Sequence, residues 1–316
     1  MSERVSTTAF IFPGQGSQAV GMGRDLFENF PAARAIFEEA DATLGDSISK
    51  ICFEGPEDQL TLTANTQPAI LTVSIAALRA LESEGFVSPS FVAGHSLGEY
   101  SAVVAAGGMS FGDAVQTVRK RGQFMQEAVP VGVGAMAAIL KLPLSDVEAV
   151  CAEASQGEVC SPANMNSAEQ TVIAGSAAAI DRAIELAKER GAKRAIKLNV
   201  SAPFHCALMM PAEERLAVEL AGLEFSDMRV PLIENVSGEQ NISGARIKEA
   251  LTQQVSSSVR WLQSVEHLVA NGVDTFVEIG PGKVLSGLVR QIAKDARCLN
   301  VENAETLRAT LAELVA

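Results

Sequence analysis

The residues from Gly94 to Gly98 read G-H-S-L-G, a pattern that can hold a reactive serine. An apolar segment at 91–93 predicts a strand before this pattern, and a helix-like segment follows it. A sharp turn between a strand and a helix can project a serine hydroxyl, here that of Ser96, above a sheet. The main-chain N–H of Leu97 could then donate to a developing oxyanion. The same five letters also fit an ordinary glycine-rich turn, so other residues must decide between the two interpretations.

A serine hydroxyl needs a base, and the chain has three histidines. His95 adjoins the serine in a tight turn, so we expect its side chain to point elsewhere. His267 lies in a helical pattern and fits a surface or packing position. His205 follows the predicted strand 194–200, directly after a proline and a phenylalanine. By elimination His205 is the best candidate for the base, and a buried histidine with a purely structural role is the alternative.

No acid stands out as the third member of a triad. An enzyme of the α/β-hydrolase type carries an Asp or Glu between the serine and the histidine, at the end of a sheet strand. Asp113, Asp146 and Asp181 all read as residues near helix starts, where carboxylates cap main-chain N–H groups. Either a neutral group or a main-chain carbonyl orients the histidine, or the serine-histidine hypothesis is wrong.

The loop at 14–19 raises a dinucleotide-binding alternative. It reads G-Q-G-S-Q-A, which fits G-x-G-x-x-A, and it follows the predicted strand 7–12. However, Pro13 opens the loop, and Glu38 and Glu39 fall in a predicted helix and not at the end of a second strand. We therefore interpret the loop as a main-chain segment beside the serine turn that supplies a second oxyanion donor.

Arg121 can be interpreted either as a surface residue or as a residue that binds substrate. In the predicted helix 111–128 the apolar residues recur at a helical period, and Arg121 falls on the flank of their stripe. Periodicity alone favours a surface arginine that extends its head into water. The alternative is a partly buried guanidinium that binds a substrate carboxylate through two hydrogen bonds.

Strands alternate with helices along most of the chain, which is typical of an α/β fold with a mostly parallel sheet covered on both faces. Besides the elements already named, we expect helices at 31–44, 68–84, 258–271 and after 280–282, and strands at 229–233 and 275–279. Pro68 would lie near the first turn of its helix. The uncharged segment 59–78 is interrupted by Asn65 and Gln67, so it predicts a buried helix with a polar start and not a membrane span.

The order of elements changes between 128 and 200. A strand at 134–140, a helix at 145–155, strands near 159–165 and 170–174, a helix at 176–190 and a strand at 194–200 follow one another. The order strand-helix-strand-strand-helix-strand is that of a ferredoxin-like unit. We expect a small inserted domain at 128–200 and a larger α/β domain formed by 1–127 and 201–316.

The composition limits the class of protein. The 316 residues are 47% hydrophobic and 20% charged, an ordinary globular profile, and the net charge of −13 disfavours general binding to nucleic acid or anionic membranes. Five cysteines form no C-x-x-C pair and read as free thiols of a reducing compartment. The N-terminus lacks the long apolar run of a signal peptide. We therefore expect a soluble, cytoplasmic protein.

Seven segments carry a resemblance to a known family. In chain order they are FPGQGSQ, GHSLGEYSA, RGQFMQEA, ANMNS, APFHCALM, QVSSSVRW and EIGPGKVLSGL. Together they closely resemble the malonyl-CoA:acyl carrier protein transacylases, which share several of these motifs with the acyltransferase domains of polyketide synthases. The resemblance covers nearly the whole chain. It implies a hydrolase-like α/β core with a ferredoxin-like insert, and the transfer of malonyl groups from coenzyme A to acyl carrier protein for fatty acid synthesis.

The resemblance also implies roles for individual residues. Ser96 would take malonyl as a covalent ester, with His205 as base and then as acid. A main-chain carbonyl, carried by the residue that matches Gln254, would orient the histidine, which explains the absent acid. The main-chain N–H groups of Gln15 and Leu97 would form the oxyanion hole.

Four further positions match substrate-binding residues of the family. Arg121 would pair with the free carboxylate of malonyl, and Gln67 and Asn166 match polar positions near the site. Phe204 stands where some relatives have serine, and its bulk should crowd an α-methyl branch and favour malonyl over methylmalonyl. The resemblance implies malonyl-CoA and acyl carrier protein as partners, with no cofactor and no metal. Nothing in the sequence indicates an obligate assembly, so we expect a monomer.

Three other functions remain open at this point. They are a plain serine esterase or thioesterase on the same elbow, a nicotinamide-binding protein that uses the loop at 14–19, and a scaffold that binds acyl carrier protein without catalysis.

Overall fold

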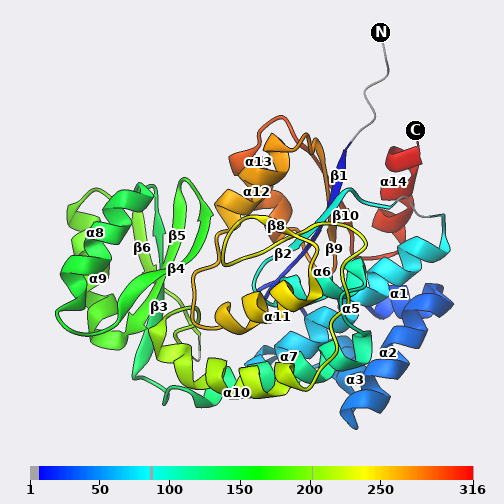
Figure 1. Cartoon of the computed structure of the whole chain (residues 1–316), viewed down its shortest axis with the longest axis horizontal. Coiled ribbons are helices and arrows are strands. Elements are labelled where there is room, and N and C mark those ends of the chain that lie inside the picture. Colours follow the sequence, from blue (N-terminus) through cyan, green and yellow to red (C-terminus); the bar gives the residue numbers. More distant parts are fainter. Residues whose placement is uncertain (1–6, 86–87, 201, 316) are drawn as a thin grey trace.

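The computed structural model describes residues 7–85, 88–200 and 202–315. Their strands form two sheets, a larger and a smaller one, which are surrounded by helices (Figure 1). Residues 1–6, on which the expectation about a signal peptide partly rests, lie outside these ranges. The larger sheet has the strand order β10-β9-β1-β2-β7-β8. Its strands are β1 (Thr8–Phe12), β2 (Phe91–Gly94), β7 (Leu232–Ile233), β8 (Gln240–Asn241), β9 (Thr275–Ile279) and β10 (Arg297–Val301). Only β8 pairs antiparallel in this described sheet, so the prediction of an α/β chain with a mostly parallel sheet is confirmed.

The parallel strands bring three distant segments together at one edge of the larger sheet. β1 and β9 are buried at every position and lie side by side, and β2 lies on the other side of β1. β1 runs into the loop at 13–17, β2 into the turn at Ser96, and β9 into the turn at 280–282. The carboxyl ends of parallel strands are where open α/β sheets bind ligands.

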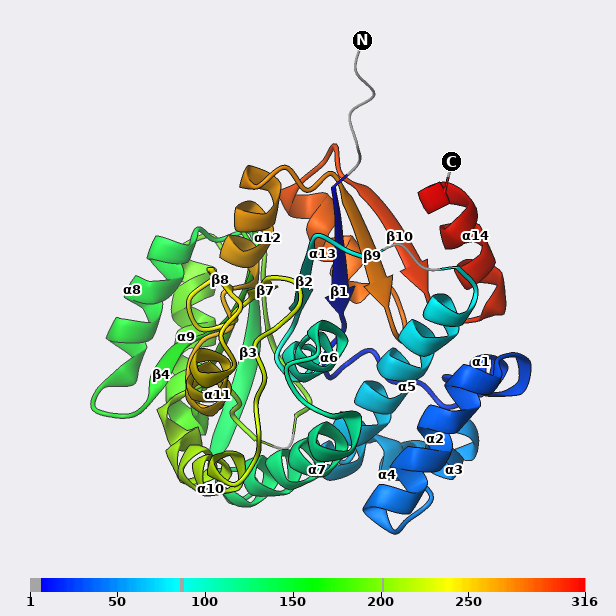
Figure 2. The same ribbon diagram turned by 45° about the vertical axis from the view of Figure 1, so that its right-hand side comes forward.

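Helices cover both faces of the larger sheet. The helices that lie against its strands are α5 (Thr63–Ser83), α6 (Leu97–Ala106), α12 (Trp261–Ala270), α13 (Val284–Ile292) and α14 (Ala304–Val315). The other helices of this body pack on these helices or on one another; they are α1 (Arg24–Asn29), α2 (Pro31–Leu44), α3 (Ile48–Glu54), α4 (Glu57–Thr61), α7 (Phe111–Glu127), the 3-10 turn η1 (Ala207–Met209), α10 (Met210–Ala221) and α11 (Gly244–Gln253). Phe10 and Phe12 of β1 belong to the core that contains α5 and α6. Ala9 and Ile11 belong to the core that contains α12 and α13. Alternate residues of β1 therefore face opposite helical layers (Figure 2).

The segment 59–78, which we expected to be one buried helix, is divided between α4 and α5. α5 is 21 residues long and begins at Thr63, so Pro68 lies inside it and not near its first turn. Most of its residues are buried because α2, α7 and the sheet pack around it. In the parts of the chain that the structure describes, no helix is both long and apolar enough to cross a membrane.

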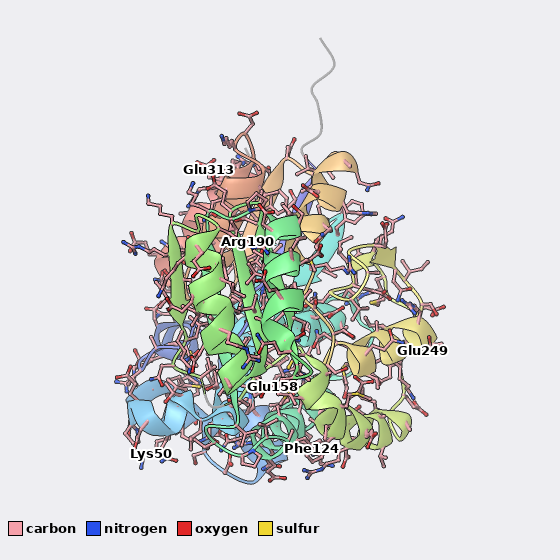
Figure 3. The ribbon with its side chains drawn as sticks, turned by 90° about the vertical axis from the view of Figure 1, so that its left-hand side faces the viewer. Lys50, Phe124, Glu158, Arg190, Glu249 and Glu313 are labelled. Carbon is pink, nitrogen blue, oxygen red and sulfur yellow. The ribbon has the colours of Figure 1, made fainter. Side chains whose placement is uncertain are left out.

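The smaller sheet lies beside the larger one and is green in Figure 1. Its strands β3 (Gly134–Leu140), β4 (Cys160–Ser167), β5 (Gln170–Ser176) and β6 (Arg194–Lys197) are antiparallel, in the order β4-β5-β3-β6. α8 (Leu144–Ser155) and α9 (Ala177–Glu189) pack on one face of this sheet. Figure 3 views this helical layer from outside. The strand expected at 194–200 ends at Lys197, because the chain beyond Leu198 leaves the sheet and lines the cavity described below.

β4 of the smaller sheet is tied to the body of the protein. Val259 N donates to Ala163 O and Met165 N donates to Val259 O, so the loop before α12 continues the edge of the smaller sheet. Ser167 Oγ, at the end of β4, donates to Gln291 Oε1 of α13. These contacts hold the smaller sheet against the body that carries the Ser96 turn.

Candidate active site

Ser96 stands between β2 and α6 with φ 52° and ψ −109°, a backbone conformation that residues other than glycine rarely adopt. Such a conformation costs about 1–3 kcal/mol and occurs mostly at functional sites. The flanking glycines permit it. A Cβ on Gly94 would lie 1.9 Å from the carbonyl oxygen of Gly98, and a Cβ on Gly98 would lie 2.0 Å from that of Phe12. The five residues therefore form a strained strand-to-helix elbow and not a relaxed turn.

The Ser96 hydroxyl and the His205 imidazole form a direct pair. Ser96 Oγ lies 2.7 Å from His205 Nε2, and His205 Nδ1 lies 2.8 Å from the main-chain carbonyl oxygen of Gln254. Because a carbonyl only accepts, Nδ1 carries the proton and Nε2 is free to accept from the serine. His205 has φ 60°, so both members of the pair hold rare backbone conformations.

Burial keeps the His205 imidazole uncharged. Desolvation and the nearby positive charge of Arg121 lower the pKa of His205 to about 3, although the hydrogen bond to the Gln254 carbonyl opposes the shift. The base form is therefore present at neutral pH. No carboxylate in the described part of the chain hydrogen-bonds to this imidazole, and Asp181 instead pairs with Lys197 on the surface.

Arg121 is buried and not at the surface, so the interpretation that periodicity favoured is wrong. Its side chain is only 1% exposed. Nη1 donates to Gln67 Oε1 at 2.8 Å, and Nη2 donates to Gln254 Oε1 at 2.8 Å and to Ser96 Oγ at 3.2 Å. In the described ranges no carboxylate forms an ion pair with Arg121, and its Nε has no hydrogen-bond partner. A buried cation without a direct counter-ion beside a reactive hydroxyl is suited to an anionic substrate.

A cavity of about 490 Å³ opens in front of the Ser96–His205 pair, a size in the usual range for small-molecule sites. Five more residues that the sequence singled out line it, namely Gln15, Gln67, Leu97, Asn166 and Phe204. Gln254 lies behind the pair and does not line the cavity. The smaller sheet contributes apolar Met136 and Val172 to the wall, together with the polar side chains of Asn164, Asn166 and Gln170, and Leu198 extends this wall.

His95 lies closer to the site than we expected. Its side chain does turn away from the serine hydroxyl, and its Nε2 lies 2.9 Å from Asn166 Oδ1. The ring packs at a tilt against Trp261, with 5.7 Å between the ring centres. His95 therefore lines the cavity and joins the elbow to the smaller sheet.

Sequence reasoning missed two buried polar residues behind the elbow, Glu99 and Asn235. Asn235 Oδ1 accepts from Ser96 N at 2.7 Å, and Asn235 Nδ2 donates to Gly94 O at 2.7 Å. Glu99 accepts from Asn235 N and from Gln254 Nε2. A signal for Glu99 was present, because it is the one charged residue of the otherwise uncharged α6. Asn235 follows the short strand β7 and has no comparable signal.

Comparisons with known proteins show which family the chain resembles. A family model described as "Acyl transferase domain" matches residues 9–311. The chain is 51% identical over 311 residues to a malonyl CoA-acyl carrier protein transacylase of Bacillus subtilis, with 98% of each chain covered. A solved structure of the malonyl CoA-acyl carrier protein transacylase from Coxiella burnetii is 41% identical to this chain. The two structures superpose with a TM-score of 0.97, and the match covers 98% of each chain. A malonyl-transacylase solved in complex with a type II polyketide acyl-carrier protein has a TM-score of 0.95 at 44% identity and covers 98% of this chain and 100% of that one. The chain therefore belongs to the acyl transferase family.

Proposed function

We propose that this enzyme transfers the malonyl group of malonyl-CoA to the phosphopantetheine thiol of acyl carrier protein and so supplies extender units for fatty acid synthesis. One observation carries the proposal: the Ser96 hydroxyl lies between an uncharged His205 and the buried guanidinium of Arg121. The pair provides a nucleophile with its base, and the guanidinium provides a counter-ion for an acyl group that is itself an anion. The names of the relatives support the same acyl group and the same acceptor.

The first half of the cycle loads the serine. As Ser96 Oγ attacks the thioester carbonyl, its proton passes to His205 Nε2 over the 2.7 Å contact. The main-chain N–H groups of Gln15 and Leu97 are the proposed donors to the tetrahedral oxyanion, and both residues line the cavity. The intermediate collapses, the C–S bond breaks, and coenzyme A leaves with the proton from His205.

The second half unloads the serine by the reverse logic. The thiol of acyl carrier protein gives its proton to His205 and attacks the malonyl ester, and Ser96 leaves with the proton returned from the imidazole. The carbonyl of Gln254 holds Nδ1 throughout, in the place where a hydrolase would have an acid. No cofactor or metal takes part in this scheme.

Four residues are proposed to select the acyl group. Arg121 would pair with the free malonyl carboxylate, because its Nη2 is only 3.2 Å from Ser96 Oγ. Gln67 holds that guanidinium from the side opposite Gln254, and Asn166 holds His95 at the cavity wall. Phe204 stands next to the base and would crowd an α-methyl branch, a difference worth about 1–3 kcal/mol.

We also propose a domain organisation and a cellular location for the protein. Residues 128–200 would form a ferredoxin-like unit, supported by the order β4-β5-β3-β6 and by the separate core beneath α8 and α9. Residues 1–127 and 201–316 would form the hydrolase-like body. Five free cysteines support the expected cytoplasmic location. The monomeric state remains a prediction.

The direct test supplies malonyl-CoA with and without acyl carrier protein that bears its phosphopantetheine arm. We expect malonyl-acyl carrier protein to form quickly and free malonate to form slowly. Release of malonate at a similar rate without the carrier would favour the esterase or thioesterase. A melting temperature that a nicotinamide dinucleotide raises equally in wild-type protein and in Ser96→Ala would favour the dinucleotide-binding alternative.

A further inference from the structure

Glu99 is a buried acid inside the site that the mechanism above does not use. It is fully buried in the first turn of α6, three residues after the serine. Its Oε1 accepts from Asn235 N at 3.1 Å and its Oε2 accepts from Gln254 Nε2 at 2.5 Å. In the described ranges no Lys, Arg or His forms an ion pair with this carboxylate. Burying a carboxyl group is costly, so a purely incidental position is a poor explanation.

The chain of hydrogen bonds from Arg121 through the Gln254 side chain to Glu99 runs in one direction only. A guanidinium can only donate, so Gln254 Oε1 must face Arg121. Gln254 Nε2 must then face Glu99 and the main-chain carbonyl of Ser96, which it meets at 2.9 Å. Glu99 therefore fixes the side chain of the same residue whose main-chain carbonyl holds His205. A triad would place an acid directly against the histidine. Here the acid is Glu99, and Gln254 lies between it and the histidine.

A second arm runs from Glu99 to the elbow through Asn235. The carboxylate accepts from Asn235 N, and the Asn235 side chain bridges the elbow from Gly94 O to Ser96 N. Asn235 and Gln254 are far from the elbow in the sequence, and Glu99 is the acceptor that they share. Removing its charge would loosen both supports together.

We propose that Glu99 is a positioning residue for acyl transfer and that it acts through Gln254 and Asn235. This inference rests on the proposed function, because it concerns the geometry of the Ser96–His205 pair during loading and unloading. Glu99 touches neither the acyl group nor the imidazole. It sets the orientation of the groups that do, and an error of about 1 Å in such a pair can cost about 100-fold in rate.

Burial gives Glu99 a protonation state that can change near neutral pH. Burial raises the pKa of Glu99 to about 8, opposed by the hydrogen bonds from Asn235 and Gln254 and by the charge of Arg121, and reinforced by Glu234. Tyr100, the next residue, is also buried and has a raised pKa, so it is uncharged. The ionised carboxylate accepts both hydrogen bonds, whereas a protonated carboxyl group has one oxygen that must also donate.

The test is Glu99→Gln, which keeps the shape and removes the second acceptor. At pH 9, where Glu99 is ionised, we expect the single-turnover rate of Ser96 loading at saturating substrate to fall about 10- to 100-fold, equally for malonyl-CoA and acetyl-CoA, with little change in KM. Glu278→Gln is the matched control. Glu278 is also a buried acid with two acceptor oxygens, but it binds Leu285 N and Ser286 N at the start of α13.

A loss in rate that exceeds that of Glu278→Gln at equal loss of melting temperature supports the proposal. A wild-type loading rate in Glu99→Gln, or a loss that resides in KM alone, overturns it. If wild-type protein forms no malonyl adduct, the proposed function fails and not this inference. If the adduct forms but Glu99→Gln loads normally, only the role of Glu99 is lost.

Discussion

The wall of the cavity that carries the reacting groups, the polar wall, is held by hydrogen bonds at each of these groups, whereas the wall from the smaller sheet mixes apolar side chains with the amides of Asn164, Asn166 and Gln170. The first wall carries Ser96, His205 and Arg121. The second also carries Met136 and Val172, and Asn166 of this wall hydrogen-bonds to His95 of the first. The difference separates two tasks. Chemistry needs fixed distances, which buried hydrogen bonds supply, and the choice of acyl group needs a shaped apolar surface.

The largest effect is expected from a methyl group added to the polar wall. In Gly98→Ala the new Cβ would lie 2.0 Å from Phe12 O, so the elbow must move. We expect loading of Ser96 to fall more than about 100-fold, with a lower melting temperature. Gly222→Ala is the control, because its Cβ meets nothing closer than 3.6 Å. Near-normal loading in Gly98→Ala would mean that the elbow geometry is not required.

Arg121→Ala tests whether the polar wall also recognises charge. Loss of a charge-assisted contact should cost about 1.5–3 kcal/mol for malonyl-CoA, or about 10- to 150-fold in kcat/KM. Acetyl-CoA has no free carboxylate and should lose much less. Arg119→Ala on the same helix is the control, because Arg119 pairs with Asp46 instead. Equal losses for both acyl groups would make Arg121 a structural residue.

Phe204→Ala tests the selection of the acyl group. Phe204 is buried beside the base and lines the cavity. Its removal should raise the kcat/KM ratio of methylmalonyl-CoA to malonyl-CoA by about tenfold, at the low end of what one methyl group can discriminate. An unchanged ratio would assign the selection to other residues of the wall.

The smallest expected effect is a pH dependence of the polar wall. Because the pKa of His205 is lowered to about 3, its imidazole stays a base above pH 5. Glu99, with its pKa raised to about 8, loses its charge as the pH falls. Wild-type loading should therefore fall by about tenfold from pH 9 to pH 7, and loading by Glu99→Gln should stay flat. A fall near pH 6.5 in the variant would show that His205 titrates normally.

The sequence predicted some elements of both sheets well and missed others. Strands β1, β3 and β9 and helix α2 matched their predicted ranges closely, because continuous apolar runs and helical periods are local signals. The short strand β8 and the half-exposed strand β10 carry no such pattern and were not predicted. The glycines at 94 and 98 predicted the elbow. His205 was predicted by elimination, because the sequence has only three histidines.

The buried layer behind the elbow could not be predicted from local patterns. Arg121 fell on the flank of its helix, yet it is enclosed because α7 packs tightly on α5, where a Cβ on Gly122 would lie 2.6 Å from Thr63 O. Asn235 and Glu99 meet across 136 positions of the sequence. Such contacts depend on how the strands and helices assemble, and no spacing along the chain encodes them.

In the proposed cycle Ser96 carries the malonyl group between its two thiol partners. The most direct measurement is the intact mass of the protein after brief exposure to malonyl-CoA, repeated after addition of acyl carrier protein with its phosphopantetheine arm. We predict one malonyl group on wild-type protein, mapped to the peptide that contains Ser96, none on Ser96→Ala, and its transfer to the carrier. An adduct at another residue, or none at all in wild-type protein, would contradict the account.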